Sequence, residues 1–493
     1  MMTELEFQGL AAQGYNRVPL TAEAFADLET PLSLYLKLVG DASHGFLLES
    51  VVGGERFGRY SFIGLPARTC LRAHRGSVEV VTDGEVVERH EANPLEFIAA
   101  YQQRFRVALR PGLPRFCGGL AGYFGYETIR SIEKKLAATR KEGGIGTPDI
   151  LLLQTEELAV IDNLSGRLYL IVYADPGQAG AYAKAQQRLA ELAARLRTSV
   201  AAPLVRKGPS YPVERELSQP EFEALVLRAK EYIAAGDCMQ VVLGHRLRKR
   251  YTESPLSLYR ALRSLNPSPY MYYYDLGDFQ IVGSSPEILV RQERQAQDAP
   301  TVVTIRPIAG TRPRGATPEQ DRAHEAELLA DPKERAEHVM LIDLARNDLG
   351  RMAQTGSVKV TEAFGIERYS HVMHIVSNVQ GQLKPGLSAL DVLKASFPAG
   401  TLSGAPKIRA MEIIDELERS ERGIYGGACG YLSFAGDMDV AIAIRTGVVK
   451  DQTLYVQAGA GVVADSVPEM EWKEIEAKAR AVLRAAELVE EGF

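Results

Sequence analysis

The segment Leu454-Tyr-Val-Gln-Ala-Gly-Ala-Gly-Val-Val-Ala464, followed by Asp465-Ser-Val-Pro468, decides between two fold classes. Its first five residues predict a strand, and Gly459, Gly461 and Ala464 have the G-x-G-x-x-G/A spacing of dinucleotide-binding folds. In those folds the glycines open a helix, and a further strand follows that helix. Here polar residues and a proline precede the next helix, and little chain remains beyond it for another strand. We therefore expect a strand whose glycines offer bare N–H groups to a carboxylate or phosphate, within an α+β fold rather than a doubly wound sheet.

The composition is typical of a soluble globular protein. The chain has 493 residues, of which 46% are hydrophobic and 24% charged, and its formal net charge is −6. This charge disfavours nucleic-acid binding, because proteins that neutralise phosphates are normally basic. The longest segment without Asp, Glu, Lys or Arg is residues 369–383, shorter than the roughly twenty apolar residues of a membrane span. Acidic residues precede the first basic residue, unlike a signal peptide, and the four cysteines form no CxxC pair, so we expect a cytoplasmic protein.

The apolar pattern predicts strands and helices that alternate irregularly. In the first half we expect a helix over residues 178–197 and short strands at 45–52, 60–64, 118–126, 151–161 and 167–173. In the second half, N-cap signals at Ser218 and Asp331 begin helices, a strand begins at Gln240, and a last helix covers 469–490. A proline-containing segment of low periodicity separates the halves. We therefore expect an N-terminal region (1–200), a linker (201–217) and a C-terminal region (218–493).

Several charged or titratable residues occupy segments where two explanations compete. Arg445 interrupts an apolar run. It could be an arginine at the edge of a sheet, paired with an acidic residue, or its guanidinium group could bind the carboxylate of a ligand through two hydrogen bonds. Glu337 and Glu474 lie on separate predicted helices; each suits a solvated helix face, but together they could bind a hard cation. Glu474 and Lys478 also have the spacing of a surface ion pair, and His374 is by default a hydrogen-bonded core residue. These residues alone indicate an Mg²⁺-assisted metabolic enzyme for a small carboxylated substrate.

Four long motifs identify a family when they are taken together. They are Pro307-Ile-Ala-Gly-Thr-Arg-Pro-Arg-Gly315, Glu337-His-Val-Met-Leu-Ile-Asp-Leu-Ala-Arg-Asn-Asp348, Pro398-Ala-Gly-Thr-Leu-Ser-Gly-Ala-Pro-Lys407 and Gln457-Ala-Gly-Ala-Gly-Val-Val-Ala-Asp465. These motifs resemble those of the chorismate-utilising enzymes, and nearly the whole chain resembles their anthranilate synthase component I group, including residues 47–50 and 118–126. The resemblance implies a mixed α/β fold in which two β-sheets pack together with helices outside.

The same resemblance implies a reaction and a role for individual residues. Ammonia would add to C2 of chorismate, the C4 hydroxyl would leave, and elimination of pyruvate would give anthranilate. Glu337 and Glu474 would bind Mg²⁺ at the ring carboxylate, Glu287 would protonate the leaving oxygen, and His374 would assist the elimination. Other matched positions would contact the substrate or assist catalysis: Gly310 and Thr311 at the ring, Tyr425 and Arg445 at the enolpyruvyl end, the backbone of Gly459, Ala460 and Gly461, and Lys478 through its charge.

Two positions distinguish among relatives by the nucleophile that they use. Gln240 stands where water-adding relatives carry a lysine base, and Ala309 stands where aminodeoxychorismate synthases carry a lysine that attacks C2. Because neither side chain can perform these tasks, the resemblance implies direct amination by ammonia. Aminodeoxyisochorismate synthase, which stops before pyruvate leaves, stays open as an alternative, as does a non-catalytic tryptophan-binding subunit. Gly244-His245 departs from the family pattern, and nothing in the sequence explains this.

The resemblance also implies a partner and an inhibitor. No cysteine has the context of a nucleophile elbow, so ammonia would come from a separate glutamine amidotransferase subunit, anthranilate synthase component II. L-Tryptophan would inhibit the first step of its own synthesis by binding at Ser50, Pro269, Tyr270 and Met271.

Overall fold

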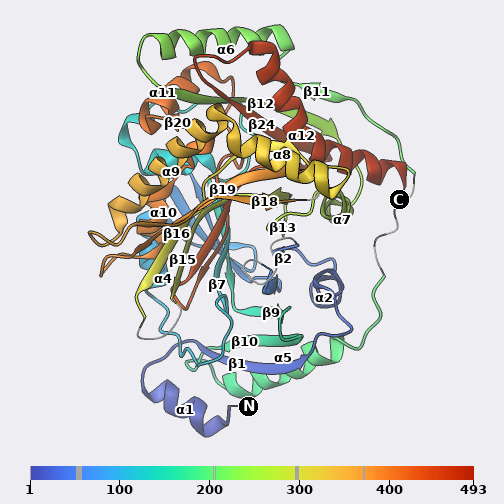
Figure 1. Cartoon of the computed structure of the whole chain (residues 1–493). Helices are drawn as coiled ribbons and strands as arrows, with labels where there is room; N and C mark the ends of the chain where they lie inside the picture. The colour runs from blue at the N-terminus through green and yellow to red at the C-terminus, as the bar shows by residue number, and fades with distance from the viewer. Residues whose placement is uncertain are drawn as a thin grey trace.

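Two large antiparallel β-sheets form the centre of the structure (Figure 1). The computed structural model describes residues 2–51, 58–201, 203, 205, 207–294, 299–369 and 372–492. In these residues each sheet contains 12 strands. This arrangement confirms the expected fold class.

The first sheet, sheet I, follows one order from edge to edge. Its order is β1 (Val18–Phe25), β10 (Arg167–Ala174), β9 (Glu157–Asp162), β3 (Tyr60–Gly64), β2 (Phe46–Glu49), β13 (Tyr270–Asp275), β14 (Phe279–Ser285), β23 (Thr446–Lys450), β24 (Thr453–Val462), β12 (Gln240–Arg250) and β11 (Val213–Arg215), with β20 (Gly404–Ala405) also on β12.

The second sheet, sheet II, is built in the same way. Its order is β17 (Ile308–Pro313), β19 (Val372–Gln382), β16 (Thr301–Ile305), β15 (Ile288–Arg294), β22 (Met438–Ile442), β21 (Ala428–Ser433), β7 (Gly119–Phe124), β8 (Ile150–Thr155), β4 (Thr69–His74), β5 (Ser77–Thr82) and β6 (Glu85–Glu91), with β18 (Lys359–Arg368) also on β19.

Alternating side chains place one apolar core between the sheets and one on each outer face. In β8, Leu151 and Leu153 enter the core shared by both sheets, whereas Ile150 and Leu152 enter the outer core of sheet II. In β13, Tyr272 and Tyr274 enter the shared core, and their neighbours Met271 and Tyr273 enter the outer core of sheet I. Because side chains of a strand alternate between faces, a strand that is covered on both sides is apolar throughout.

Helices cover the outer faces, as Figure 1 shows. They are α1 (Glu4–Ala12), α2 (Pro31–Leu38), α4 (Pro94–Gln102), α5 (Ala181–Arg195), α6 (Gln219–Ala234), α7 (Pro255–Leu265), α8 (Pro318–Ala330), α9 (Pro332–Met352), α10 (Ala389–Ser396), α11 (Lys407–Leu417) and α12 (Pro468–Glu491), with short 3₁₀ helices η1 (Tyr126–Ser131), η2 (Lys134–Leu136) and η3 (Gly400–Leu402). No helix among the described residues is long and apolar enough to cross a membrane.

The predicted helix starts agree with the structure. Ser218 caps α6 in a capping box with Glu221, and the Asp331 side chain accepts hydrogen bonds from the N–H groups of Lys333 and Glu334 at the start of α9. One strand prediction is wrong: residues 151–161 form two strands, β8 and β9, that belong to different sheets. Both strands are almost wholly buried, so the apolar run carries no sign of the break. The expected strand over 45–52 is β2, and residue 52 lies outside the described residues.

Each sheet takes strands from both sides of the expected linker. The N-terminal and C-terminal strands meet at the β2–β13 pair in sheet I and at the β7–β21 pair in sheet II. The linker range itself contains β11, which forms an edge of sheet I. The two sequence regions are therefore joined through continuous sheets.

Candidate active site

The glycines of β24 lie close to groups from three other segments. A Cβ on Gly459 would lie 2.9 Å from Tyr425 Oη, and a Cβ on Gly461 would lie 2.6 Å from Gln240 Nε2. Such distances are too short for a carbon contact, so a side chain at Gly459 or Gly461 would have to displace the neighbouring group. Ala460, between them, is fully buried in the outer core of sheet I. The strand thus presents bare backbone on one face.

Lys478 joins this strand to helix α12. Its ammonium group donates to the Gly459 carbonyl at 3.0 Å and lies 2.6 Å from Glu474 Oε1. The Glu474–Lys478 pair is thus the expected surface ion pair, with both side chains about half exposed, 47% and 43%. The lysine also contacts the proposed substrate strand.

The strands β17 and β19 bring His374 to Gly310 and Thr311. The imidazole Nδ1 lies 2.8 Å from the Gly310 carbonyl oxygen and 3.2 Å from Thr311 Oγ1. A carbonyl oxygen only accepts, so Nδ1 carries the proton and Nε2 carries the lone pair. Nε2 is buried and has no hydrogen-bond partner within the part of the chain that the structure describes. Burial lowers the pKa of His374 to about 4, so the ring is neutral at pH 7.

Glu287 is a buried carboxyl group at the start of β15. Burial raises its pKa from 4.5 to about 7, although a hydrogen bond from Thr401 and the charges of Lys478 and Arg445 act in the opposite direction. The Thr401 hydroxyl donates to Oε1 at 3.0 Å from η3. A carboxyl group with such a pKa can hold a proton near neutral pH and donate it.

Arg445 precedes β23 in a left-handed backbone conformation, with φ of 48°. Its guanidinium has no hydrogen-bond or ion-pair partner among the residues described, so the paired edge arginine of the first explanation is not found there. Burial lowers its pKa, and the nearby Tyr369 and Glu287 partly oppose this. A partly buried guanidinium without a partner among the described residues suits an anionic ligand.

Glu337 on α9 and Glu474 on α12 face a common region. Burial raises the pKa of Glu337, and the negative charges of Glu334 and Glu474 raise it further. No cluster of three or more potential ligands from His, Cys, Asp and Glu occurs in the described ranges. Two nearby carboxylates, of which Glu474 also pairs with Lys478, fit Mg²⁺, which is commonly held by one or two protein carboxylates together with water and substrate oxygens.

Electrostatics connects these side chains into one site. The positive charges of Lys478 and Arg445 lower the pKa of Glu287. The pKa of Glu337 is lowered by Lys478 and raised by Glu474, and the pKa of His374 is lowered by Arg445. Tyr425, a buried residue beside Gly459, has its pKa raised by burial first, with Glu474 contributing. The structure therefore places the charged and titratable residues of the prediction, Glu287, Arg445, His374, Lys478, Glu337 and Glu474, in one region, while the roles of all predicted site residues stay predictions.

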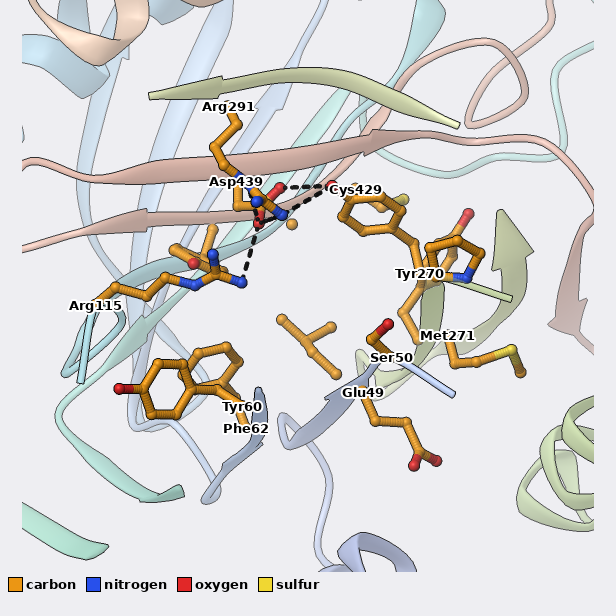
Figure 2. Close-up of a pocket in the computed structure, with 15 residues that line it drawn as sticks. Glu49, Ser50, Tyr60, Phe62, Arg115, Tyr270, Met271, Arg291, Cys429 and Asp439 are labelled. Atoms are coloured by element: carbon orange, nitrogen blue, oxygen red, sulfur yellow. Dashed lines mark hydrogen bonds and ion pairs between the residues drawn. The ribbon is translucent and has the colours of Figure 1, made fainter. Parts of the chain in front are cut away.

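The four residues expected to bind tryptophan line a different cavity, shown in Figure 2. It is open to solvent and lies at the junction of β2 and β13. Ser50 and Met271 lie side by side at the ends of neighbouring strands, as Figure 2 shows, and Pro269 and Tyr270 line the same cavity. Arg115 and Arg291 lie 3.4 Å and 2.8 Å from Asp439 Oδ2 at one end of the cavity.

Sequence reasoning missed several residues that support the site. Thr401 was quoted within a motif but received no role, although it is the hydrogen-bond partner of Glu287. Glu418 and Arg422 form a buried pair beside Tyr425. Arg115 and Asp439 line the second cavity. Only Thr401 had a sequence signal, its place in the 398–407 motif; the others depend on long-range contacts.

A two-sheet fold with a buried acid, a neutral imidazole, a guanidinium that has no ion-pair partner among the described residues, and two nearby carboxylates defines an enzyme for a small anionic substrate. Comparisons with known proteins specify this class. A family model for chorismate binding enzymes matches residues 64–484. The chain is 60% identical over 496 residues to anthranilate synthase component 1 of Neisseria meningitidis serogroup A, with 100% of both chains covered. It is 54% identical to that of Pseudomonas aeruginosa, with 99% of both covered.

A solved structure agrees with these relatives. The crystal structure of anthranilate synthase component I from Streptococcus pneumoniae matches with a TM-score of 0.77 and 37% identity, over 93% of this chain and 98% of that chain. The chain belongs to the chorismate-binding enzyme family. Its predicted resemblance to anthranilate synthase component I is confirmed.

Proposed function

We propose that this chain converts chorismate and ammonia into anthranilate and pyruvate. The observation that carries the proposal is the full-length identity of 60% to an anthranilate synthase component 1. Gln240 and Ala309 support it, since neither offers a base for water or an amine that attacks C2. Both are buried in the site region, with exposed fractions of 6% and 8%.

Substrate binding would use the positive groups around the β24 glycines. Arg445 would bind the enolpyruvyl carboxylate through two parallel N–H···O hydrogen bonds from its guanidinium group. The Tyr425 hydroxyl, next to Gly459, would donate a hydrogen bond to the same end of the substrate. Glu337 and Glu474 would hold Mg²⁺ next to the ring carboxylate, where the metal would withdraw electrons from the ring. The dianion would thus meet matched positive charge in a partly buried site.

The proton steps would use Glu287 and His374. As the C–N bond forms at C2 and the C4–O bond breaks, Glu287 would give its proton to the departing oxygen, which leaves as water. His374 Nε2, with its free lone pair, would then accept the C2 proton while the bond from C3 to the enolpyruvyl oxygen breaks. The group leaves as enolpyruvate, which becomes pyruvate when its CH2 carbon takes up a proton. Gly310 and Thr311 would hold the imidazole in the required tautomer through Nδ1.

Ammonia would come from a separate glutamine amidotransferase subunit, and tryptophan would inhibit the reaction. The relatives' name, component 1, supports the existence of a partner. The cavity lies between the β2–β13 end of sheet I and strands of sheet II, and the guanidinium groups of Arg115 and Arg291, which share the single carboxylate of Asp439, suit the carboxylate of an amino acid. Its position between strands of both halves would let the inhibitor bias their arrangement.

The experiment is a product assay. Chorismate, Mg²⁺ and ammonium salts at alkaline pH should give anthranilate, detected by its fluorescence, and pyruvate in equal amounts. An aminated product that retains the enolpyruvyl group would instead identify an aminodeoxyisochorismate synthase. Absence of any turnover with ammonia, and with a glutamine amidotransferase partner, would contradict the proposal.

A further inference from the structure

A buried ion pair outside the proposed chemistry lies directly behind the site. Glu418 ends helix α11, and Arg422 lies in the loop that leads to β21; their side chains are only 5% and 1% exposed. The Arg422 guanidinium donates Nε to Glu418 Oε2 at 2.9 Å and Nη2 to Oε1 at 2.5 Å. Such a two-point arginine–carboxylate contact fixes orientation as well as distance. A buried pair is weak evidence for stability, so its contacts are the better guide to its purpose.

The pair binds backbone from two walls of the site. Arg422 Nη1 donates to the Leu402 carbonyl at 2.6 Å, and Nη2 donates to the Val242 carbonyl at 2.8 Å. The N–H of Gly244 donates to Glu418 Oε1 at 2.8 Å. Leu402 is the neighbour of Thr401 in η3, and Val242 and Gly244 belong to β12, which pairs with the glycine strand β24.

The same guanidinium lies beside the aromatic side chains that close the site from behind. Its Cζ is 4.7 Å from the ring centre of Tyr126 and 5.7 Å from that of Tyr425. Tyr425 Oη in turn lies against Gly459. The Arg422 guanidinium thus contacts three parts of the site: the backbone of Leu402, next to Thr401; the backbone of β12, which pairs with β24; and the ring of Tyr425.

We propose that Glu418 and Arg422 are positioning residues, which hold Thr401 against Glu287 and Tyr425 against Gly459. This inference rests on the proposed function. Neither residue would touch chorismate. They would influence catalysis in two ways: by keeping the hydrogen bond from Thr401 to Glu287, and by keeping the Tyr425 hydroxyl next to Gly459.

The proposal predicts a change in the pH profile that a purely structural role would not produce. Arg422→Lys keeps the positive charge but cannot make the two parallel hydrogen bonds of a guanidinium group. Glu418→Gln keeps the size and shape of the side chain but removes its negative charge. In both variants we expect kcat to fall by about tenfold to a hundredfold, because small displacements in a site have effects of this size. Because the Thr401 hydrogen bond lowers the pKa of Glu287, its loss should move the alkaline limb of the profile to higher pH by about half a unit to one unit.

Two further variants make the test specific. Thr401→Val should give the same shift of the alkaline limb, and combining it with Glu418→Gln should add no further shift. Glu490→Gln is the matched control, because Glu490 forms another buried ion pair, 2.8 Å from Lys249, on the site-bearing elements α12 and β12. That variant should lose stability but keep the wild-type profile.

Anthranilate production by the wild-type protein is measured first. If the wild type makes no anthranilate, the proposed function is wrong, and this result is independent of any effect of the variants. Wild-type profiles in folded Arg422→Lys and Glu418→Gln, or shifts that add to that of Thr401→Val, would overturn the positioning role. If both variants fail to fold while Glu490→Gln folds, the pair is a general stability element and the proposal is also wrong.

Discussion

Glu287 shows how one residue acquires its chemistry from its surroundings. An ordinary glutamate is ionised at neutral pH, but burial raises the pKa of this carboxyl group to about 7. The opposing effects of Thr401, Lys478 and Arg445 keep the pKa from rising further. The balance leaves a substantial protonated fraction at neutral pH, as an acid that donates to a leaving group requires.

The pH dependence of activity should therefore report Glu287. With the concentration of free ammonia held constant, kcat/KM for chorismate should fall as pH rises through about 7, because the ionised carboxylate cannot donate. Glu287→Gln should lower kcat by about 10²–10⁴-fold and abolish this limb. Steady-state kinetics across the pH range measures both effects. A variant with the wild-type profile would assign the limb to another group.

The raised pKa of Glu287 also predicts a pH-dependent cost in stability. The unfolded carboxyl ionises near 4.5 and the folded one near 7, so its contribution to stability is complete below the first value and lost as pH rises through the second. The loss is on the order of 3 kcal/mol. Glu287→Gln lacks this titration, so its Tm relative to wild type should increase between about pH 5 and pH 8. Parallel Tm curves for the two proteins would contradict the buried acid.

The facing carboxylates give a test of the metal. Glu337→Gln and Glu474→Gln should each leave the protein folded, lower activity strongly and raise the Mg²⁺ concentration needed for half-maximal turnover. Glu469→Gln is the control, because Glu469 forms an exposed ion pair with Lys473 one turn earlier on α12. Titration of Mg²⁺ against turnover gives the answer. Equal Mg²⁺ requirements in all four proteins would exclude the two-carboxylate site.

At the scale of elements, the β2–β13 pair determines the second cavity. Met271 pairs with Glu49 across the two strands, so Ser50 continues directly from the paired residues. Glu49 accepts hydrogen bonds from Tyr259 and Arg263 of α7, which ties β2 to the C-terminal half. The cavity therefore adjoins the junction of the two halves, away from the candidate active site.

Substitutions on these two strands should separate inhibition from catalysis. Ser50→Phe would fill the cavity, and Met271→Thr would loosen the packing of β13 behind the cavity lining. Both should therefore raise the inhibitory tryptophan concentration many-fold. Activity without tryptophan should stay nearly unchanged, because neither residue lies among the proposed catalytic groups. Tryptophan titrations of chorismate turnover measure the effect. Inhibition curves that overlay the wild type would place the effector site elsewhere.

At the scale of the whole molecule, the two halves share both sheets and the core between them. Close backbone contacts reinforce the β7–β21 junction: a Cβ on Gly119 would lie 2.1 Å from the Leu432 carbonyl oxygen. Residues of the shared core, such as Phe62 and Tyr431, come from different halves and different sheets, with ring centres 5.5 Å apart. Neither half could therefore bury its apolar surface alone.

We accordingly expect the halves to unfold together. Scanning calorimetry should show a single thermal transition, and cleavage within residues 201–212 should leave the two fragments associated. Two well-separated transitions, each retained by an isolated fragment, would instead show independent domains.

The sequence by itself determined the local elements, because their signals are local. The capping boxes, the glycines of β24 and the apolar periodicity act within a few residues, so Ser218, Asp331 and the last helix could be placed correctly. Long motifs also identified the family and hence candidate residues such as Glu287 and Arg445.

The tertiary structure alone decided which strands share a sheet and which groups surround each site residue. The run over 151–161 divides between two sheets because burial on both faces hides the crossing in an apolar sequence. The pKa of Glu287 depends on burial and on Thr401, which lies 114 residues away in the chain, and Arg422 contacts Val242 across 180 residues. Desolvation and hydrogen bonding arise from such distant contacts, so no local pattern can encode their strength.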